Sequence, residues 1–387
     1  MISRELSLGH RLDQGFSVLL LGPRGVGKTM LARQVLSHRA DRLEIDLLAP
    51  ESYERYLRDP SLFEQDVLGR QAKVVFVDEI QKLPGLLDVI HRLYERERVQ
   101  FLLTGSSARK LRRGGANLLA GRLLGMRLHP LTCREVALPE SQILQFGSLP
   151  GVVLENPAPD ATLRAYVHLY LKEEILEEAL VRKTVAFSRF LELAGQYHGE
   201  PVNATRIGRL VGVSAHTVQE YFQILEDTLM VFRLPGWSAS VTRQLRTAPR
   251  YFLFDNGVAH ALKGELRVES SPRTSRFGKL FESRVLQEAF WLNDYRELDL
   301  KFSYWQSNTG LEIDLIASRG AGPPLAALEI KSDTAPGPSH WKGLTAFRSE
   351  YPEAACFCLC RTPHPYRASD GVEVLPWTEG LEILASL

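Results

Sequence analysis

One short stretch near the start of the chain has the residue types and spacing of a phosphate-binding loop. Residues 22–29 read GPRGVGKT, fit the pattern G-x-x-x-x-G-K-[ST] and follow an apolar run over residues 18–21. The glycines let backbone N–H groups turn toward phosphate oxygens, the lysine brings positive charge to the β- and γ-phosphates, and the hydroxyl takes a place on Mg²⁺. The pattern predicts that ATP and Mg²⁺ are bound by Gly22, Pro23, Arg24, Gly25, Val26, Gly27, Lys28, Thr29 and Met30.

Two acids end the next strongly apolar segment. Residues 73–80 read KVVFVDEI, which predicts a buried strand with Asp78 and Glu79 at its carboxyl end. Beside a phosphate loop, Asp78 can hold the Mg²⁺ shell together with Thr29. Glu79 can orient or deprotonate the attacking water. We therefore expect Asp78 in the metal site and Glu79 and Lys28 in the catalytic set.

A third apolar segment, residues 99–107, ends in Ser106 and Ser107. Either hydroxyl could reach the γ-phosphate or its attacking water from a neighbouring strand, which would add Ser106 to the catalytic set. Serine is also a preferred N-cap of helices. The sequence leaves these two roles open.

A second group of acids lies near the end of the chain. Residues 311–332 predict two strands joined by a Gly/Pro loop, with Asp314 on the first strand and Glu329 and Lys331 on one face of the second. Buried carboxylates cost several kcal/mol unless a cation compensates them, and oxygen ligands suit Mg²⁺ or Mn²⁺. We expect Asp314 and Glu329 to hold the metal and Lys331 to position or activate water. Glu282 would complete the shell from the amphipathic helix expected over residues 276–292.

These acids allow other interpretations. Glu312 shares a face with Asp314 in strict alternation, and the strands could be a solvated pair at a sheet edge, with acids and lysines pairing across it. Apolar residues on both faces favour central strands instead. The fold could also be kept for binding while turnover is lost. Metal-assisted phosphodiester hydrolysis is the reaction that uses such a set of groups.

The elements that must position the front site alternate between apolar strands and helices. This βαβ rhythm continues to about residue 132 and predicts a parallel sheet with helices on both faces and the ligand at the carboxyl ends of the strands. Helical periodicity without glycine or proline follows over residues 161–183, and again over most of 185–199, as a lid or bridge.

Residues 203–237 predict two short helices, a Gly-Val-Ser turn between them and a β-like tail, which is the pattern of a winged helix-turn-helix. The second helix would be capped by Ser214. If this unit contacts a DNA groove, the exposed candidates are His216, Thr217, Gln219 and Gln223. Nearby acids oppose phosphate contact, namely Glu220, Glu226 and Asp227. A basic run could offset them, namely Arg243, Arg246 and Arg250. Winged helices also serve as spacers or protein-docking modules.

The composition limits the choice of partners. The chain has 387 residues, 44% apolar, with 47 basic and 46 acidic side chains, so any nucleic-acid contact must come from local patches. No segment has the length and apolar character of a membrane span, and the polar N-terminus lacks a secretory core. We expect a cytoplasmic protein with no membrane partner. Cys356, Cys358 and Cys360 alternate along one predicted strand, where buried thiols are a simpler reading than a metal site.

The ordered motifs of the front part resemble the AAA+ superfamily, in particular bacterial and archaeal ATPases with a C-terminal domain of unknown function. The matching segments are GPRGVGKT, VVFVDEIQKLP, LLTGSSARKL, LLAGRLLGMRLHPLTCRE and FGSLPGV. The resemblance implies that Arg122 senses the nucleotide phosphate or acts in trans; a solvated arginine before a strand is the alternative. Action in trans would imply a homo-oligomer such as a ring.

The spacing of Asp314, Glu329 and Lys331 is similar to that of the PD-(D/E)xK nuclease superfamily, with a restriction-endonuclease-like fold. The resemblance implies a nuclease-like domain. One departure is the missing proline, because Glu312 and Ile313 precede Asp314.

The sequence thus predicts an α/β protein in three parts: a P-loop ATPase core at residues 1–152, a helical lid or bridge and winged helix at 153–250, and a nuclease-like domain at 251–387. The predicted function is Mg²⁺-dependent ATP hydrolysis coupled to DNA binding or remodelling, with branched DNA as one candidate substrate. The alternative is a nucleotide-controlled protein-interaction switch or scaffold whose nuclease-like fold does not catalyse.

Overall fold

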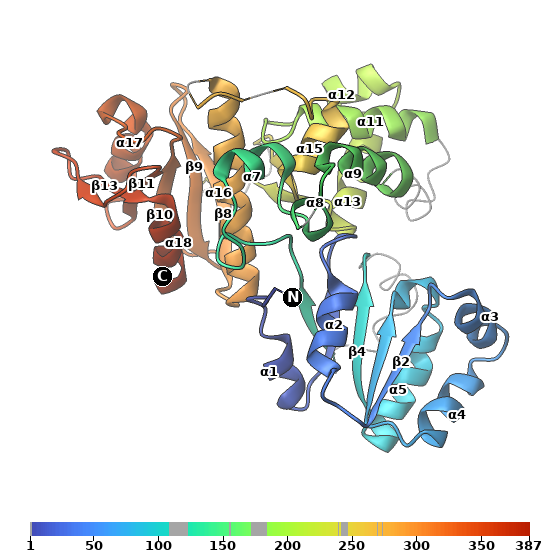
Figure 1. The fold of residues 1–387 in the computed structure, drawn as a ribbon. Helices are drawn as coiled ribbons and strands as arrows, with labels where there is room; N and C mark the ends of the chain where they lie inside the picture. Colours follow the sequence, from blue (N-terminus) through green and yellow to red (C-terminus); the bar gives the residue numbers. More distant parts are fainter. Residues whose placement is uncertain are drawn as a thin grey trace.

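The computed structural model describes residues 2–107, 123–154, 156–171, 184–238, 240, 247–268, 270–272 and 274–387. Figure 1 shows a lobe built around one sheet at the lower right, a group of helices at the upper right and a second sheet at the upper left. The chain is therefore an α/β protein, as predicted. Within the described ranges, no helix is both long and apolar enough to cross a membrane.

The first sheet is parallel and has five strands in the order β2-β3-β4-β1-β5. The strands are β1 (Ser17–Leu21), β2 (Arg42–Asp46), β3 (Val74–Asp78), β4 (Gln100–Gly105) and β5 (Leu123–Arg127). All five residues of β3 are buried, as expected for a strand covered on both faces. The predicted parallel sheet is confirmed, and β1 lies between β4 and β5.

Helices cover both faces of this sheet, and the alternation of strand side chains decides which helix packs where. The helices are α1 (Leu8–Asp13), α2 (Lys28–Leu36), α3 (Pro50–Arg58), α4 (Ser61–Gly69), η1 (Ile80–Lys82) and α5 (Leu86–Glu97). Val74 and Phe76 pack in one apolar cluster with α1 and α2. Val75 and Val77 pack in another with α3, α4 and α5. The sheet is thus the middle of three layers.

The middle of the chain is mainly helical. Its helices are α7 (Glu140–Phe146), α8 (Pro150–Val153), α9 (Pro159–Ala165), the π-helix η3 (Tyr166–Leu171), α11 (Thr184–Gln196), α12 (Ala204–Val211), α13 (Ala215–Asp227) and α15 (Asn256–Lys263). Two short strands pair antiparallel, β6 (Val231–Leu234) and β7 (Arg250–Leu253). Asn203 caps α12 by accepting from the Arg206 N–H, and Ser214 caps α13 by accepting from the Thr217 N–H. Between the two helices, Gly212 adopts φ 77°, which favours glycine.

The second sheet is mixed, with six strands in the order β12-β13-β11-β10-β9-β8. They are β8 (Leu300–Gln306), β9 (Glu312–Arg319), β10 (Pro324–Ile330), β11 (Ala355–Cys360), β12 (Tyr366–Arg367) and β13 (Glu373–Pro376). Its helices are α16 (Ser275–Tyr295), η4 (Pro338–His340), α17 (Lys342–Glu350) and α18 (Trp377–Ser386). The predicted strand pair is present as antiparallel β9 and β10.

Both faces of this sheet are apolar. Leu328 and Ile330 pack with α16 and α18, whereas Ala327 packs with α17. Cys356, Cys358 and Cys360 are buried, free thiols in the cluster beside α17, as the sequence predicted. The strands that carry the acids are therefore central strands and not a solvated edge.

The apolar packing runs across the predicted boundary at residue 152. One cluster includes Leu8 of α1, Leu163 of α9, Phe190 of α11 and Val258 of α15. The helical middle is thus built directly onto the first sheet, and the division of the chain at residues 152 and 250 stays a prediction.

Candidate functional site

The phosphate loop joins β1 to α2 by a tight path. A Cβ atom at Gly22 would overlap the carbonyl oxygen of Leu128, so only glycine fits between β1 and the segment that follows β5. Gly27 has φ 95° and caps α2, which begins at Lys28. The loop therefore opens at the N-terminus of a nine-residue helix, where free backbone N–H groups and the helix dipole favour an anion.

Lys28 is folded over its own loop. Its ammonium group donates to the carbonyls of Gly22 at 2.8 Å and Pro23 at 3.1 Å, and lies 4.0 Å from Oε1 of Glu79. The residue is only 5% exposed. Phosphate oxygens in the loop would offer this buried cation stronger, charged acceptors than the two carbonyls.

Asp78 ends β3 between two hydroxyl donors. Thr29 donates to Oδ2 at 2.8 Å, and Thr104 from β4 donates to Oδ1. Burial raises the pKa of Asp78, although both hydroxyl groups act in the opposite direction. A buried carboxylate next to the Thr29 hydroxyl is a donor set that suits Mg²⁺. The residues present thus fit the metal that the sequence predicts.

Glu79 is held in an unusual backbone conformation. Its φ is 57°, which is uncommon for a residue with a side chain, and its N–H donates to the Thr104 hydroxyl at 3.0 Å. The buried amide of Gln81 donates to the Glu79 carboxylate and, at 2.9 Å, to the Ser106 hydroxyl. The carboxylate is therefore oriented by Gln81 of η1 and by Ser106, the residue after β4.

Thr104 and Gln81 were not predicted as site residues. A sequence signal existed for each: Thr104 precedes Ser106 by two residues in LLTGSS, and Gln81 follows Glu79 by two residues in DEIQ. The Ser106 hydroxyl lies 3.4 Å from the Glu79 carboxylate. Residues 108–122 lie outside the described residues, so the structure does not test the capping role of Ser106 or Ser107 or the role of Arg122.

The remaining loop residues differ in what they contact. The Arg24 carbonyl accepts a hydrogen bond from Tyr166 of η3 at 3.0 Å, so the helical middle lies against the loop. Met30 is 56% exposed, whereas Val26 is fully buried. The Val26 carbonyl accepts a hydrogen bond from Arg4 at 2.8 Å.

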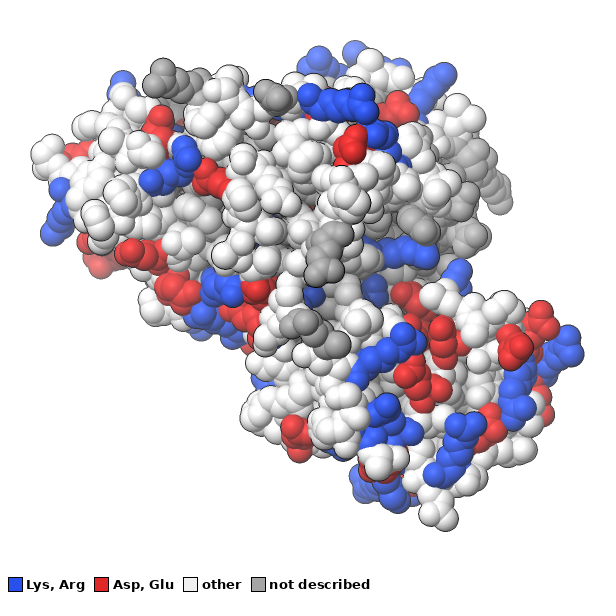
Figure 2. Space-filling model, in the orientation of Figure 1, with Lys and Arg blue, Asp and Glu red and all other residues white. Residues whose placement is uncertain are grey.

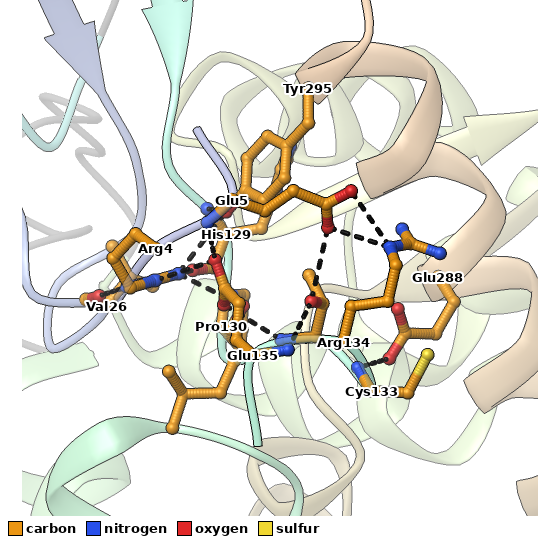
Figure 3. A network of polar contacts seen from close by, with 12 residues as sticks. Arg4, Glu5, Val26, His129, Pro130, Cys133, Arg134, Glu135, Glu288 and Tyr295 are labelled. Atoms are coloured by element: carbon orange, nitrogen blue, oxygen red, sulfur yellow. Dashed lines mark hydrogen bonds and ion pairs between the residues drawn. The ribbon is translucent and has the colours of Figure 1, made fainter. Parts of the chain in front are cut away.

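Arg4 is the centre of a polar network that the sequence did not reveal (Figure 3). Besides Val26, its guanidinium donates to the His129 carbonyl at 2.6 Å and to the Tyr295 hydroxyl at 3.3 Å. Its Nε forms an ion pair with Glu135 at 3.0 Å, and the two side chains are 6% and 2% exposed. We call these five residues the Arg4 network. It joins the phosphate loop, the segment after β5 and the last residue of α16.

Further contacts attach the segment after β5 to the third part of the chain. The His129 ring lies 2.7 Å from Asp294 and stacks on Trp291, both on α16. The Cys133 N–H donates to Glu288 of α16 at 2.7 Å. Residues 128–135 therefore contact both the phosphate loop and α16.

The acids near the end of the chain form a second cluster. Asp314 and Glu329 are 7% and 6% exposed, and Lys331 lies 3.9 Å from Asp314 and 2.5 Å from Glu329. The Ile330 N–H donates to Asp314 at 2.7 Å. Burial, followed by the neighbouring Asp314, raises the pKa of Glu329 well above its usual range. Burial alone would lower the pKa of Lys331, but these two carboxylates raise it.

Arg250 supplies the other side of this cluster. Its guanidinium lies 2.8 Å from Glu312 and 3.8 Å from Glu282, and the side chain is 8% exposed. Burial and the nearby Asp314 raise the pKa of Glu282 to about 8. We predicted Arg250 as part of a basic run offsetting acids at a DNA surface. That prediction is wrong, because the Arg250 side chain is buried in an acidic cluster.

The predicted metal shell is only partly assembled. Among the described residues, no three carboxylate, histidine or cysteine groups lie together at metal-ligand spacing. Glu282 lies 3.8 Å from Arg250, and it is also near enough to Asp314 for that carboxylate to raise its pKa. Oε2 of Glu329, however, is buried and has no hydrogen-bond partner in the described structure. Asp314 and Glu329 thus fit a cation held by two carboxylates and water.

Strict alternation also fails around Asp314. Strand β8 pairs Ser303 with Ile316 and Trp305 with Ile313, so β9 has one extra residue in the interval that contains Asp314. Such a β-bulge changes the direction of the side chains within it.

The helix-turn-helix candidates lie on the surface of α13. His216, Gln219 and Gln223 are exposed, and Thr217 is partly buried beside its cap Ser214. Arg206 and Arg209 on α12 are exposed too. Arg243 and Arg246 lie outside the described residues. Figure 2 shows Lys and Arg side chains interspersed with Asp and Glu over the visible face.

Three family models match successive parts of the chain. An AAA domain matches residues 15–137, a domain of unknown function (DUF8612) matches residues 140–270, and a domain of unknown function (DUF4143) matches residues 277–380. Residues 15–137 are thus an AAA-type P-loop domain. The other two models carry no described function, so they do not bear on the predicted nuclease-like domain.

The chain is also similar to uncharacterized proteins. One, from Mycobacterium tuberculosis, is 28% identical over 337 residues, which cover 85% of this chain and 73% of the relative. Another, from Haemophilus influenzae, is 25% identical over 295 residues, covering 68% and 74%. A solved structure of the replication initiator DnaA bound to AMPPCP and single-stranded DNA aligns with a TM-score of 0.31 and 13% identity, over 58% of this chain and 90% of that one. A similarity of that size carries no argument about fold or partners.

Proposed function

We propose that this protein hydrolyses ATP with Mg²⁺ at the phosphate loop and couples the nucleotide state to DNA. The observation that carries the ATPase is the meeting of Lys28, Asp78 and Glu79, with Thr29 and Thr104 as hydroxyl donors to Asp78. These groups come from α2 and from the carboxyl ends of β3 and β4, where ligands bind in α/β sheets.

Each residue has a separate task in this proposal. Lys28 leaves the carbonyls of its own loop to hold the β- and γ-phosphates. Thr29 and Asp78 hold Mg²⁺, which neutralises charge on the phosphates. Glu79, aimed by Gln81, accepts a proton from the attacking water, and Ser106 holds that water from β4. Arg122 stabilises transition-state charge, and its action in trans requires a homo-oligomer such as a ring.

DNA is the partner that the middle of the chain fits. Two helices, α12 and α13, are followed by the antiparallel strands β6 and β7, which is the order of elements in a winged helix-turn-helix. In such units the second helix enters the major groove while the first crosses the backbone. By this geometry His216, Gln219 and Gln223 would contact base edges, and the exposed Arg206 and Arg209 would contact phosphates.

The salt dependence of DNA affinity tests this surface. Replacing both Arg206 and Arg209 with alanine removes two phosphate contacts, so the slope of log K against log salt falls by about 1.8 for duplex DNA. The matched control replaces the exposed Arg58 and Arg70 of the first lobe and leaves the slope unchanged. An equal effect in both double variants would show that α12 is not the DNA surface.

The cluster around Lys331 supports a second activity at the other end of the chain. The orphan oxygen of Glu329 beside Asp314 suits one divalent cation, and Lys331 lies where it can position water for phosphodiester hydrolysis. In the alternative function, a protein-interaction switch or scaffold, the nuclease-like fold does not catalyse. Arg250 favours that alternative because a fixed cation 3.8 Å from Glu282 opposes a metal ion at the same carboxylate.

Steady-state ATP hydrolysis against a panel of labelled DNAs distinguishes these functions. The panel holds single-stranded, duplex, forked and four-way-junction DNA, and strand cleavage is scored in the same tube. We expect at least one DNA to change the turnover of the wild type, whereas Lys28→Ala has no turnover to change. Unchanged turnover with intact strands across the panel would refute the DNA proposal in favour of the protein-directed switch.

A further inference from the structure

The acidic cluster has two built-in cations that serve different carboxylates. Lys331 contacts Asp314 and Glu329, and Arg250 contacts Glu282 and Glu312. If all four carboxylates are ionised, as metal binding requires, they carry two more charges than the two cations offset, and this excess equals the charge of one divalent cation. Because buried charge is costly without compensation, the number of fixed cations should determine how many metal ions the cluster can take.

Arg250 is fixed in its position by the surrounding structure. It is the first residue of β7, and its guanidinium lies over the Tyr304 ring at 4.5 Å. The Tyr304 hydroxyl in turn donates to the Ala248 carbonyl at 2.7 Å, two residues before Arg250. The backbone of Arg250 pairs with Leu234 of β6. The Arg250 side chain is thus fixed at its backbone end by strand pairing and at its guanidinium end by the Tyr304 ring.

Two buried polar atoms in the cluster have no hydrogen-bond partner within the described structure. Oε2 of Glu329 is one, and Nε of Arg250 is the other. Both residues are 6% exposed. An unsatisfied carboxylate oxygen is an acceptor for a cation on the Lys331 side. Glu312, which lies near Arg250, has no unpaired carboxylate oxygen, because Arg250 donates to one of its oxygens and Gln306 donates to the other.

We propose that Arg250 takes the place of a divalent cation between Glu282 and Glu312 and so lowers the metal occupancy of the cluster by one. A guanidinium gives these carboxylates one positive charge and directed N–H donors, where a metal would give two charges. The remaining place is the pair Asp314 and Glu329. The inference deepens the cation binding proposed above and does not depend on ATP turnover or DNA cleavage.

Counting bound Mn²⁺ tests this inference. Titration calorimetry and electron paramagnetic resonance are carried out on nucleotide-free full-length protein carrying Asp78→Asn, so that the phosphate loop does not add a site. We expect Arg250→Gln to bind one more Mn²⁺ per chain than its parent. Arg319→Gln, an exposed arginine at the far end of β9, is the matched control and keeps the parental count. Arg250→Lys retains a cation and keeps it too.

The site of the additional ion is tested by a second substitution. Adding Glu282→Gln to Arg250→Gln should remove the extra Mn²⁺ and leave the parental number. If Arg250→Gln is unfolded alone, millimolar Mn²⁺ should restore its circular dichroism and cooperative unfolding, because the ion replaces the missing charge. An unfolded variant that Mn²⁺ does not rescue would overturn the inference.

The outcomes separate this inference from the proposed cation site. If parent and Arg250→Gln each bind one Mn²⁺ with equal affinity, the role of Arg250 is refuted and the site at Asp314 and Glu329 stands. If neither binds Mn²⁺, both proposals fail. A gain of one ion supports the inference whether the parent binds none or one.

Discussion

The guanidinium of Arg4 donates to the carbonyl oxygen of Val26 at 2.8 Å, within the phosphate loop. The same guanidinium reaches the hydroxyl of Tyr295, the last residue of α16. One buried cation thus contacts both the nucleotide site and the longest helix of the third part of the chain (Figure 3). The consequences of removing it can be measured separately as stability and as turnover.

Arg4→Met should lower the free energy of unfolding by about 3 kcal/mol, because it leaves the buried Glu135 carboxylate without its charge partner. Urea denaturation measures this change. Arg11→Met is the control: its partner Glu297 is 52% exposed, so the loss should stay below about 1 kcal/mol. Equal losses in the two variants would contradict a special role for Arg4.

Glu79→Gln should reduce the ATP turnover number at least about 100-fold while nucleotide affinity changes little, because the amide cannot accept the proton of the attacking water. Turnover is measured by phosphate release and affinity by fluorescent-nucleotide titration. Glu97→Gln, an exposed acid at the end of α5, should keep wild-type turnover. Full activity in Glu79→Gln would remove this residue from the mechanism.

Thr104→Val keeps the side-chain shape but removes the hydroxyl that donates to Asp78 and accepts from the Glu79 N–H. We expect the Mg²⁺ concentration for half-maximal turnover to rise about tenfold, equivalent to about 1.4 kcal/mol. Magnesium titrations at saturating ATP provide the measurement. The exposed Thr205→Val on α12 is the control. An unchanged Mg²⁺ requirement would mean that Thr104 does not orient Asp78.

Glu282 should make stability fall as the pH rises. Its pKa is raised from 4.5 to about 8, so between these values the folded protein holds a proton that the unfolded chain has released. The contribution of Glu282 to the free energy of unfolding is therefore largest below pH 4.5 and is lost as the pH approaches 8. Because the side chain is 24% exposed, we expect the loss to be only about 1 kcal/mol.

Urea denaturation at several pH values, in a chelator to exclude metals, measures the effect. Glu282→Gln cannot ionise and should show a shallower decrease between pH 4.5 and pH 8 than the wild type. Glu379→Gln, an exposed acid in the first turn of α18, is the control. Identical pH profiles for wild type and Glu282→Gln would show that Glu282 ionises at its ordinary pKa.

The sequence predicted the parts of the site that are contiguous. Residues 22–29 and the pair Asp78 and Glu79 could be assigned because spacing within one strand–loop–helix unit determines their geometry. The burial of Leu328 opposite Glu329 followed from strand alternation. Their specific tasks in catalysis stay predictions.

Contacts between distant parts of the chain could not be predicted in this way. Arg4 precedes its partner Tyr295 by 291 positions, and no local pattern marks either residue. Arg250 belongs to a basic run in the sequence, yet the pairing of β7 with β6 carries it into the acidic cluster. The bulge at Asp314 likewise depends on the register with β8.

Helix α16 carries Tyr295 at its last position and Glu282 thirteen residues earlier, so about 20 Å of continuous helix separates them. A helix of this length acts as a lever arm. A tilt of about 5° at the Tyr295 end would displace Glu282 by about 1.7 Å, more than the difference between a made and a broken hydrogen bond. If a shift of the phosphate loop moved Arg4 and tilted this helix at Tyr295, the displacement would therefore be large at the other end, where Glu282 lies 3.8 Å from Arg250.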